Sequence, residues 1–374
     1  MNRKSYFRTF AGVATCLSLA FASVANACTS FLLPASDGGF VYARTLEFGL
    51  DIESSGISIG RGVAMKGTGI DGKAGSGLSW TSKYAAIGAS GLNLPILVDG
   101  FNEKGLAGGM LYAPNISQFQ EVSPAESSRS IASYEMLVYA LTNFATVDEA
   151  REGFRKIKVN QSPQQAFKGV VPLHMTLHDT SGKSIVIEYI GGELQIHDNP
   201  TSVLTNAPHF SWHLNNLGNY AGLSTRNPAP IKVGDASFGS PSSGGGMTGL
   251  PGDMSSPSRF VRAFLLSQNA PKKLDSRQQV ATAFHILNNF DIAPGMISLG
   301  GGFGGSSGGY EITYWSAVSD LKNQIFYIRT FGNPSVQAIR MADIDPTIAE
   351  IRHFDLNNPW NIHVISERKA PAKP

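Results

Sequence analysis

The sequence predicts an α+β fold in which antiparallel sheets are covered by helices. Groups of strand-like segments, some arranged as hairpins, alternate with two pairs of helix-like segments. A doubly wound sheet would instead require one helix between successive strands, and the chain does not follow that order. The 374 residues include 41 glycines, which indicates many turns and close backbone contacts rather than a bundle of helices.

The first 27 residues have the features of a secretory signal peptide. Basic residues precede an apolar run over about 10–24, and Ala25-Asn-Ala27 supplies the small residues of a cleavage site. The apolar run is shorter than the roughly 20 residues needed to span a bilayer, and no later run is long enough. We therefore expect a signal peptide over 1–27, a periplasmic or secreted mature chain and no membrane span.

The mature chain, 28–374, has no internal repeat and no evident linker, so we expect a single domain that ends in a flexible tail at about 364–374. Two stretches rich in glycine and serine, 239–249 and 294–309, are either surface loops or the walls of a binding cleft. Strands are expected at 28–34, 40–44, 85–90, 106–112, 174–178, 184–189, 311–319 and 324–330. Helices are expected at 130–144, 146–157, 257–269 and 276–289.

Cleavage after Ala27 would make a cysteine the first residue of the mature chain. Of the two cysteines, Cys16 lies within the expected signal peptide, so Cys28 is the one thiol that remains. A thiol, with a free pKa of about 8.5, needs a base to become a strong nucleophile. An N-terminal cysteine carries that base itself, because its α-amine titrates near about 7.7–8.0. This logic matches that of N-terminal threonine enzymes, and it favours Cys28 as a catalytic nucleophile.

A positive charge is expected beside this thiol. If the first two strands form a hairpin centred on Ser36, Cys28 and Arg44 lie directly opposite each other. Their Cβ atoms would then be roughly 5 Å apart, and a guanidinium at that distance favours the thiolate. The alternative for Arg44 is a solvated charge at the end of a strand.

An inactive binding protein, lipid-anchored or secreted, is the alternative from a different class. Bacterial lipoproteins also begin with a cysteine after a signal peptide, and there the cysteine is acylated. Such sites usually have a leucine-like residue three positions before the cysteine, where this chain has Ala25. An unmodified α-amine on Cys28 would distinguish the nucleophile from the anchor.

Charge and histidine content exclude other classes of function. The 30 basic and 28 acidic residues give a net charge of +2, which provides no reason to expect nucleic acid or an anionic membrane as a partner. The eight histidines form no HExxH or similar metal motif. His209 and His213 are four residues apart in a turn-like aromatic stretch, and we expect neither a metal nor another cofactor.

Five segments that cover nearly the whole mature chain form an ordered set of motifs. The first runs from Cys28-Thr-Ser to Ala43-Arg-Thr-Leu-Glu-Phe48. The others are Asn102-Glu-Lys-Gly-Leu106, Leu204-Thr-Asn-Ala-Pro208, Gly249-Leu-Pro-Gly-Asp-Met-Ser-Ser-Pro-Ser-Arg-Phe-Val-Arg262 and Asp320-Leu-Lys-Asn-Gln-Ile-Phe-Tyr-Ile-Arg-Thr330. In this order the five segments resemble the choloylglycine hydrolase and penicillin V acylase family.

The resemblance implies the four-layered αββα fold of N-terminal-nucleophile hydrolases and a set of roles. Cys28 would attack an amide carbonyl and hold the acyl group as a thioester until water releases it, while its α-amine carries the proton to the leaving amine. The side chain of Asn206 and the backbone N–H of Tyr112 would form an oxyanion hole. Arg44 and Arg259 would adjust the thiol and order the site. The family's tendency to form tetramers implies a homo-oligomer.

One position departs from the family pattern. Many relatives place an aspartate near the α-amine, and this chain has Glu47, which reaches one methylene further. Glu47 lies three residues beyond Arg44, so it points to the opposite face of the strand unless the strand bends.

The resemblance also bears on the substrate, a small molecule with an N-acyl amide. The residue that matches Tyr112 is often tyrosine in penicillin V acylases and asparagine in bile salt hydrolases. The chain is therefore expected to remove a small aromatic or fatty acyl group from an amine, as penicillin V acylases do. Conjugated bile salts and N-acyl homoserine lactones are the alternative substrates.

Overall fold

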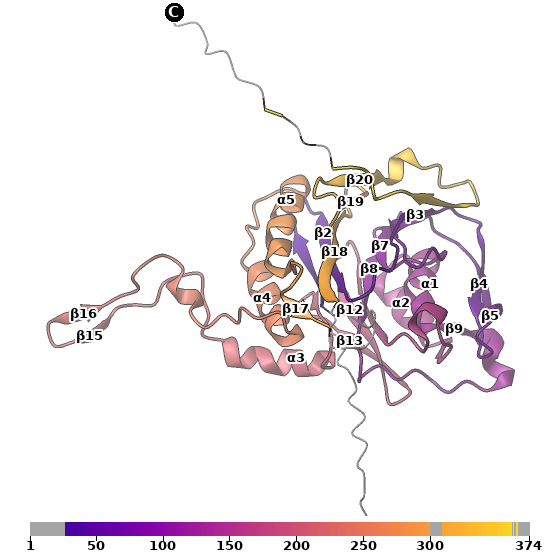
Figure 1. The fold of residues 1–374 in the computed structure, drawn as a ribbon, viewed down its shortest axis with the longest axis horizontal. Helices are drawn as coiled ribbons and strands as arrows, with labels where there is room; N and C mark the ends of the chain where they lie inside the picture. Colours follow the sequence, from indigo (N-terminus) through magenta and orange to yellow (C-terminus); the bar gives the residue numbers. More distant parts are fainter. Residues whose placement is uncertain (1–26, 300–308, 361, 363, 366–374) are drawn as a thin grey trace, which may run out of the picture.

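Two antiparallel sheets packed face to face form the centre of the molecule (Figure 1). The structure is a computed structural model that describes residues 27–299, 309–360, 362 and 364–365. Within these residues the first sheet has seven strands, six of them in the order β14-β1-β2-β18-β19-β20, with β17 paired to β18. Its strands are β1 (Cys28–Pro34), β2 (Phe40–Phe48), β14 (Val203–Leu204), β17 (Ile297–Ser298), β18 (Tyr310–Asp320), β19 (Ile325–Thr330) and β20 (Gln337–Arg340).

The second sheet has eight strands in the described residues, in the order β13-β12-β11-β8-β7-β6-β3-β21. They are β3 (Gly56–Ile59), β6 (Ala86–Ala89), β7 (Asp99–Asn102), β8 (Ala107–Tyr112), β11 (Leu173–His178), β12 (Ser184–Ile190), β13 (Glu193–Asp198) and β21 (Ile351–Phe354). Three small sheets pair β4 (Ala64–Thr68) with β5 (Ala74–Thr81), β9 (Ser130–Ala132) with β10 (Lys158–Asn160), and β15 (Ile231–Val233) with β16 (Ala236–Phe238).

Helices cover the outer face of each sheet, so the molecule has the expected αββα layers (Figure 1). Helices α4 and α5 contact β1 of the first sheet, and α1 contacts β7 and β8 of the second. Strands β1 and β2 contact β8 across the interface between the sheets. The helices are α1 (Met136–Asn143), α2 (Val147–Phe154), α3 (Phe210–Leu217), α4 (Ser256–Gln268) and α5 (Ser276–Leu287).

The central strands β1 and β2 are buried almost along their full length, because one face meets the second sheet and the other meets helices. Their apolar runs suit such burial on both faces. Polar caps fix the helix ends. Asp275 accepts from the N–H of Gln278 at the start of α5, and Thr146 accepts from the N–H of Glu149 at the start of α2.

All eight expected strands are present, with ends that differ by a few residues. Three of the four expected helices are also confirmed, but 130–144 is helical only from Met136, because its first residues form β9 and a short 3-10 turn. Helix α3 was not expected in its aromatic stretch. It begins after His209, whose side chain accepts from the N–H of Trp212. The strands β3, β4, β5, β7, β10, β13, β14, β15, β16, β17, β20 and β21 were missed as well.

The first hairpin has a different register from the expected one. Cys28 pairs with Leu46, and Arg44 pairs with Ser30, so the hairpin is centred on residue 37 rather than Ser36. The turn explains the shift, because the N–H of Ala35 bonds the carbonyl of Gly39 around that residue. Cys28 and Arg44 are therefore diagonal neighbours on one face instead of direct partners.

The hairpin β15–β16 projects away from the two-sheet body on a long excursion between α3 and α4 (Figure 1). The glycine- and serine-rich stretch 239–249 lies on this excursion, and part of the second such stretch, 300–308, lies outside the described residues. Most of the expected signal peptide and of the expected tail also lies outside them. No helix in the described part of the chain is long and apolar enough to cross a membrane.

Candidate active site

Cys28 begins β1, where the first sheet faces the second, and only 1% of the residue is exposed. Strand β1 lies between β14 and β2, so residues from both neighbours approach the cysteine. A cavity opens beside it. The side chains that line this cavity are almost all apolar: Cys28, Arg44, Leu46, Phe48, Ile52, Gly91, Leu92, Ile96, Val98, Met110, Tyr112, Tyr134, Phe167, Val171 and Leu173.

Arg44 provides a fully buried positive charge next to the thiol. Its Nη2 atom lies 3.6 Å from the Cys28 Sγ atom, and its Nη1 atom donates to the carbonyl of Val98 at 2.7 Å. The guanidinium also lies over the ring of Trp315, 5.2 Å from its centroid. Burial alone would lower the pKa of Arg44, but Cys28 and Asp99 raise it above its ordinary value. The diagonal register thus still brings the cation to the sulfur.

Asp99 supports this cation from the second sheet. Its carboxylate lies 3.7 Å from Arg44 Nη1 and accepts from the hydroxyl of Tyr42 at 3.0 Å. Burial raises the pKa of Asp99 to about 7, against the opposing effect of Arg44. Sequence reasoning missed Asp99, because it lies on a short strand that was not expected.

Asn206 holds the nitrogen of Cys28. Its Oδ1 atom accepts from the Cys28 N–H at 2.8 Å and from Arg259 Nη2 at 2.7 Å. Its Nδ2 atom donates to the carbonyl of Tyr112 at 2.7 Å. The amide nitrogen has two hydrogens, and the Tyr112 bond uses one of them. The orientation of the amide is therefore fixed at both ends, and one N–H remains for a ligand.

The main chain of Tyr112 faces this site. Its neighbour Ala113 donates to the carbonyl of Pro172 on the β11 side. Successive residues of a strand direct their main-chain groups to opposite sides, so the N–H and C=O of Tyr112 point away from β11. The contact with Asn206 uses the carbonyl of Tyr112.

Arg259 of α4 joins the strand to the helix layer. It donates to the carbonyl of Cys28, to the hydroxyl of Thr29 at 2.8 Å and to the carbonyl of Met254 at 2.9 Å, in addition to Asn206. Burial lowers its pKa, although the nearby carboxylates oppose that shift. These bonds connect Arg259 to the backbone of Cys28 rather than to its sulfur, so it can order the site.

Two buried carboxylates lie near Arg259, and one of them was not expected. Glu47 donates its N–H to the carbonyl of Ala27 at 3.0 Å. Burial raises the pKa of its side chain well above the ordinary value, with Arg259 opposing. Burial raises the pKa of Glu311 to about 7, against the opposing effects of Arg259 and of the nearby N–H of Ala27. Sequence reasoning missed Glu311, which precedes an apolar run in β18.

Three aromatic rings form one wall of the cavity. Phe48 and Tyr112 meet edge to face with centroids 5.3 Å apart, and Phe167 lies 5.8 Å from Phe48 and 6.5 Å from Tyr112. Such offset and edge contacts are favourable between aromatic rings. The wall suits an apolar or aromatic group bound next to the thiol.

The two histidines of the aromatic stretch, His209 and His213, make structural contacts. His209 caps α3, and His213 donates from Nε2 to the carbonyl of Asn206 at 3.0 Å. Within the described residues, no group of three or more histidine, cysteine, aspartate and glutamate side chains could hold a metal ion.

Comparisons with known proteins find a family model and similar sequences that cover most of the chain. The model of the linear amide C–N hydrolases, choloylglycine hydrolase family, matches residues 28–352. The chain is 30% identical over 342 residues to the bile salt hydrolase/transferase of Clostridium perfringens, covering 91% of this chain and 100% of that protein. It is 28% identical over 340 residues to the penicillin V acylase of Pectobacterium atrosepticum, covering 84% of this chain and 81% of that protein.

A solved structure has the same fold. A mutant of the conjugated bile acid hydrolase from Clostridium perfringens superposes with a TM-score of 0.79 at 28% identity, covering 91% of this chain and 100% of that chain. This match confirms the four-layered αββα sandwich.

Proposed function

Because the chain belongs to the choloylglycine hydrolase family of linear amide C–N hydrolases, we propose that Cys28 is its nucleophile and that it hydrolyses N-acyl amides through a thioester. The single observation that carries this proposal is the environment of Cys28. Its sulfur lies beside the buried cation of Arg44, and its nitrogen bonds the amide of Asn206. Both groups of an N-terminal cysteine are thereby placed for attack and proton transfer.

The reaction follows from these positions. The free α-amine of Cys28 takes the thiol proton, and the sulfur attacks the carbonyl carbon of the amide. The remaining N–H of Asn206 and the N–H of Tyr112 stabilise the oxyanion. The amine then passes the proton to the leaving nitrogen, the C–N bond breaks and the acyl group stays on sulfur. Water, deprotonated by the same amine, attacks the thioester and releases the acid, which restores the thiol. Every step uses groups of the chain and water.

An acyl group like that of penicillin V fits the cavity best. The wall of Phe48, Tyr112 and Phe167 offers three aromatic rings and little hydrogen-bonding capacity. A phenoxyacetyl group can pack there, and so can the tail of an N-acyl homoserine lactone. The hydroxyls of a conjugated bile salt would find few partners in the same place. The relatives named above include both a bile salt enzyme and a penicillin V acylase.

Hydrolysis of a small panel tests the proposal. Mature protein starting at Cys28 would be assayed with penicillin V, glycocholate and several N-acyl homoserine lactones, with Cys28→Ala as the matched control. We expect the highest kcat/KM for penicillin V or an N-acyl homoserine lactone and no turnover by the control. A preference for glycocholate would change the assigned substrate to a conjugated bile salt. Binding without any turnover would instead indicate an inactive binding protein.

We also propose that the chain is exported and cleaved between Ala27 and Cys28. The support is the Ala25-Asn-Ala27 motif after an apolar run. Intact-mass analysis of protein from a periplasmic fraction would give a mass that begins at Cys28 without modification. An added diacylglycerol would make it a lipoprotein, and a cytoplasmic, uncleaved chain would contradict export.

Assembly into a homo-oligomer is part of the same proposal. The hairpin β15–β16 extends from the body with Ile231, Val233 and Phe238 each more than 60% exposed (Figure 1). A second copy of this chain would bury them. Light scattering after size exclusion should give a multiple of the monomer mass, and charged substitutions at these three positions should reduce it. A monomeric native protein would contradict the assembly.

A further inference from the structure

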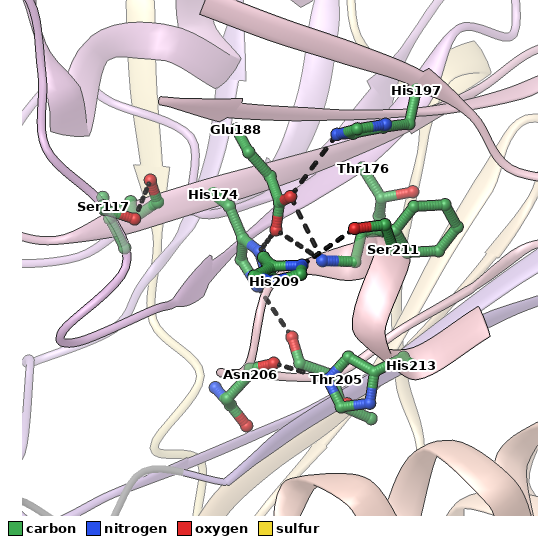
Figure 2. Close-up of polar contacts among 12 residues, drawn as sticks. Ser117, His174, Thr176, Glu188, His197, Thr205, Asn206, His209, Ser211 and His213 are labelled. Carbon is green, nitrogen blue, oxygen red and sulfur yellow. Dashed lines mark hydrogen bonds and ion pairs between the residues drawn. The ribbon is translucent and has the colours of Figure 1, made fainter. Parts of the chain in front are cut away.

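The turn that carries Asn206 is held by side chains from three other elements. The carbonyl of Thr205 accepts from His174 Nε2 at 2.8 Å, and the carbonyl of Asn206 accepts from His213 Nε2 at 3.0 Å. The N–H of Asn206 donates to the Ser256 hydroxyl at 2.9 Å. Three main-chain groups next to the Asn206 side chain therefore have side-chain partners, from β11, α3 and α4. Figure 2 shows the contacts made by His174 and His213.

His174 is fully buried, and its second ring nitrogen faces a carboxylate. Nδ1 lies 3.0 Å from Glu188 Oε1, and Glu188 also accepts from the N–H of Phe210 at 3.1 Å. Burial alone would raise the pKa of Glu188, but the contacts with His174 and Phe210 lower it below its ordinary value. His197 lies 3.6 Å from the other oxygen of Glu188. Figure 2 shows His174 between Glu188 and the Thr205 carbonyl.

These two contacts determine the orientation of the ring. A carbonyl oxygen can only accept, so His174 Nε2 must carry the proton in its bond to Thr205. The carboxylate of Glu188 likewise only accepts, so Nδ1 donates to it, and this second bond prevents the ring from rotating away, in the way that a carboxylate orients a catalytic histidine. Glu188 in turn connects β12 to the first residue of α3, so the end of the turn is fixed by the same group.

Stability is a poor explanation for this cluster. A buried charged pair contributes little net free energy, because the cost of removing both groups from water offsets their attraction. A directed donor to one peptide carbonyl, by contrast, sets the plane of the peptide bond that leads into Asn206. That plane decides where the Asn206 amide points, and the amide bonds both the Cys28 nitrogen and Tyr112.

We propose that His174, oriented by Glu188, is a positioning residue for amide hydrolysis that holds Asn206 in its reactive direction. The inference rests on the proposed function of Cys28 and Asn206. His174 does not touch the reacting atoms in this arrangement and acts through the turn. Misplacement of a catalytic group by about 1 Å can cost about 100-fold in rate, so a bond at this distance from the chemistry has a measurable effect.

Two amide substitutions at His174 each retain an N–H near one of the ring nitrogens, so they test its two hydrogen bonds separately. A glutamine amide can place an N–H near the position of Nε2, and an asparagine amide can place one near Nδ1. With penicillin V, we expect His174→Gln to retain kcat within about fivefold, and His174→Asn and His174→Ala to lower it about 10- to 100-fold with KM within about twofold. The matched control is His178→Gln on the same strand. His178 is also fully buried, but it bonds Thr176 and Ser184 instead of the turn.

A double-mutant cycle decides whether the effect passes through Asn206. If it does, His174→Asn should have no further effect on kcat in an Asn206→Ala background. Alkylation of Cys28 by iodoacetamide, followed by intact mass, gives a second readout without substrate, and both single variants should change its rate alike. Additive losses, or equal kcat losses in His174→Asn and His178→Gln, would overturn the positioning role. Failure of the wild-type protein to hydrolyse any amide, with normal alkylation of Cys28, would instead contradict the proposed function.

Discussion

Cys28 has separate partners at its sulfur and at its nitrogen. Arg44 lies 3.6 Å from the sulfur, while Asn206 accepts from the nitrogen at 2.8 Å. Arg259 bonds the same Asn206 oxygen and the Cys28 carbonyl. The sulfur of Cys28 and its main chain are therefore contacted by different arginines.

Asn206 gives the most direct test at the residue scale. Asn206→Ala removes the donor for the oxyanion and the acceptor for the amine, so kcat should fall by roughly 10²–10³ with little change in KM. Asn206→Asp keeps the acceptor but places a negative charge beside the oxyanion, and it should be at least as slow. Steady-state kinetics on folded variants measures both. A large rise in KM at constant kcat would move Asn206 to substrate binding, and an unaffected variant would leave it a turn residue.

The site could be predicted from sequence as far as its residues are adjacent to recognisable motifs. The role of Cys28 could be predicted from its position after Ala27. The face of the strand on which Arg44 lies could be predicted from the alternation of side chains along a strand. The hairpin centre was wrong by one residue, but such an error moves the partner by two positions and preserves the face. Asp99 and Glu311 could not be found, because their role depends on which strands lie next to each other.

At the scale of elements, the close approach of β2 and β8 fixes Arg44. Gly109 of β8 pairs with Asp99, and a Cβ at this position would lie 2.5 Å from the Tyr42 hydroxyl and 2.7 Å from the Asp99 carboxylate. The same Cβ would lie 3.0 Å from Cδ of Arg44. The absence of a side chain at Gly109 thus allows the ion pair to form between the sheets.

Gly109→Ala should therefore reduce both activity and stability. The methyl group must displace the Tyr42–Asp99–Arg44 contacts, and overpacking of this kind costs about 1–3 kcal/mol. We expect kcat/KM to fall at least about tenfold. The free energy of unfolding, measured by urea titration of the same samples, should fall as well. Gly332→Ala is the control, since a Cβ there meets nothing within 4 Å. Equal behaviour of the two variants would show that the sheets adjust without moving Arg44.

At the scale of the whole molecule, the two apolar sheets could be predicted from the sequence, but the order of the strands within them could not. Continuous apolar segments such as Phe31–Leu33 and Ile185–Ile187 are buried in opposite sheets, as their composition indicates. The sequence contains no local signal for the pairing of β14 with β1 or of β18 with β2, which join residues far apart in the chain. Short strands such as β3 and β7 were missed because glycine and polar residues interrupt their pattern.

The buried carboxyl of Asp99 makes global stability depend on pH. Burial raises its pKa from 3.8 to about 7, so between these values the folded protein keeps a proton that the unfolded chain has released. The free energy of unfolding should therefore fall as pH rises from about 4 to about 7. Asp99→Asn should flatten this fall in urea titrations at several pH values. Asp198→Asn is the control, because the Asp198 side chain is 87% exposed. An unchanged slope in Asp99→Asn would contradict the protonated, buried state.

In the proposed mechanism, the presence or absence of a residue before Cys28 determines whether the folded molecule can act. Ala27 is only 2% exposed, its carbonyl accepts from the N–H of Glu47 at 3.0 Å, and its N–H faces Glu311. A preceding residue thus fits the site without displacing Cys28. It nevertheless converts the nitrogen of Cys28 from an amine into an amide, which cannot accept a proton.

A chain that keeps Ala27 should therefore fold normally and remain inactive. Loss of the general base typically costs about 10²–10⁴ in rate, and we expect a decrease of this size for penicillin V hydrolysis relative to the chain that begins at Cys28. Intact mass would establish the N-terminus of each sample, and equal urea midpoints would show that folding is unaffected. Iodoacetamide should still reach Cys28 in both. Full turnover by a sample whose mass retains Ala27 would exclude the α-amine as the base and require another group.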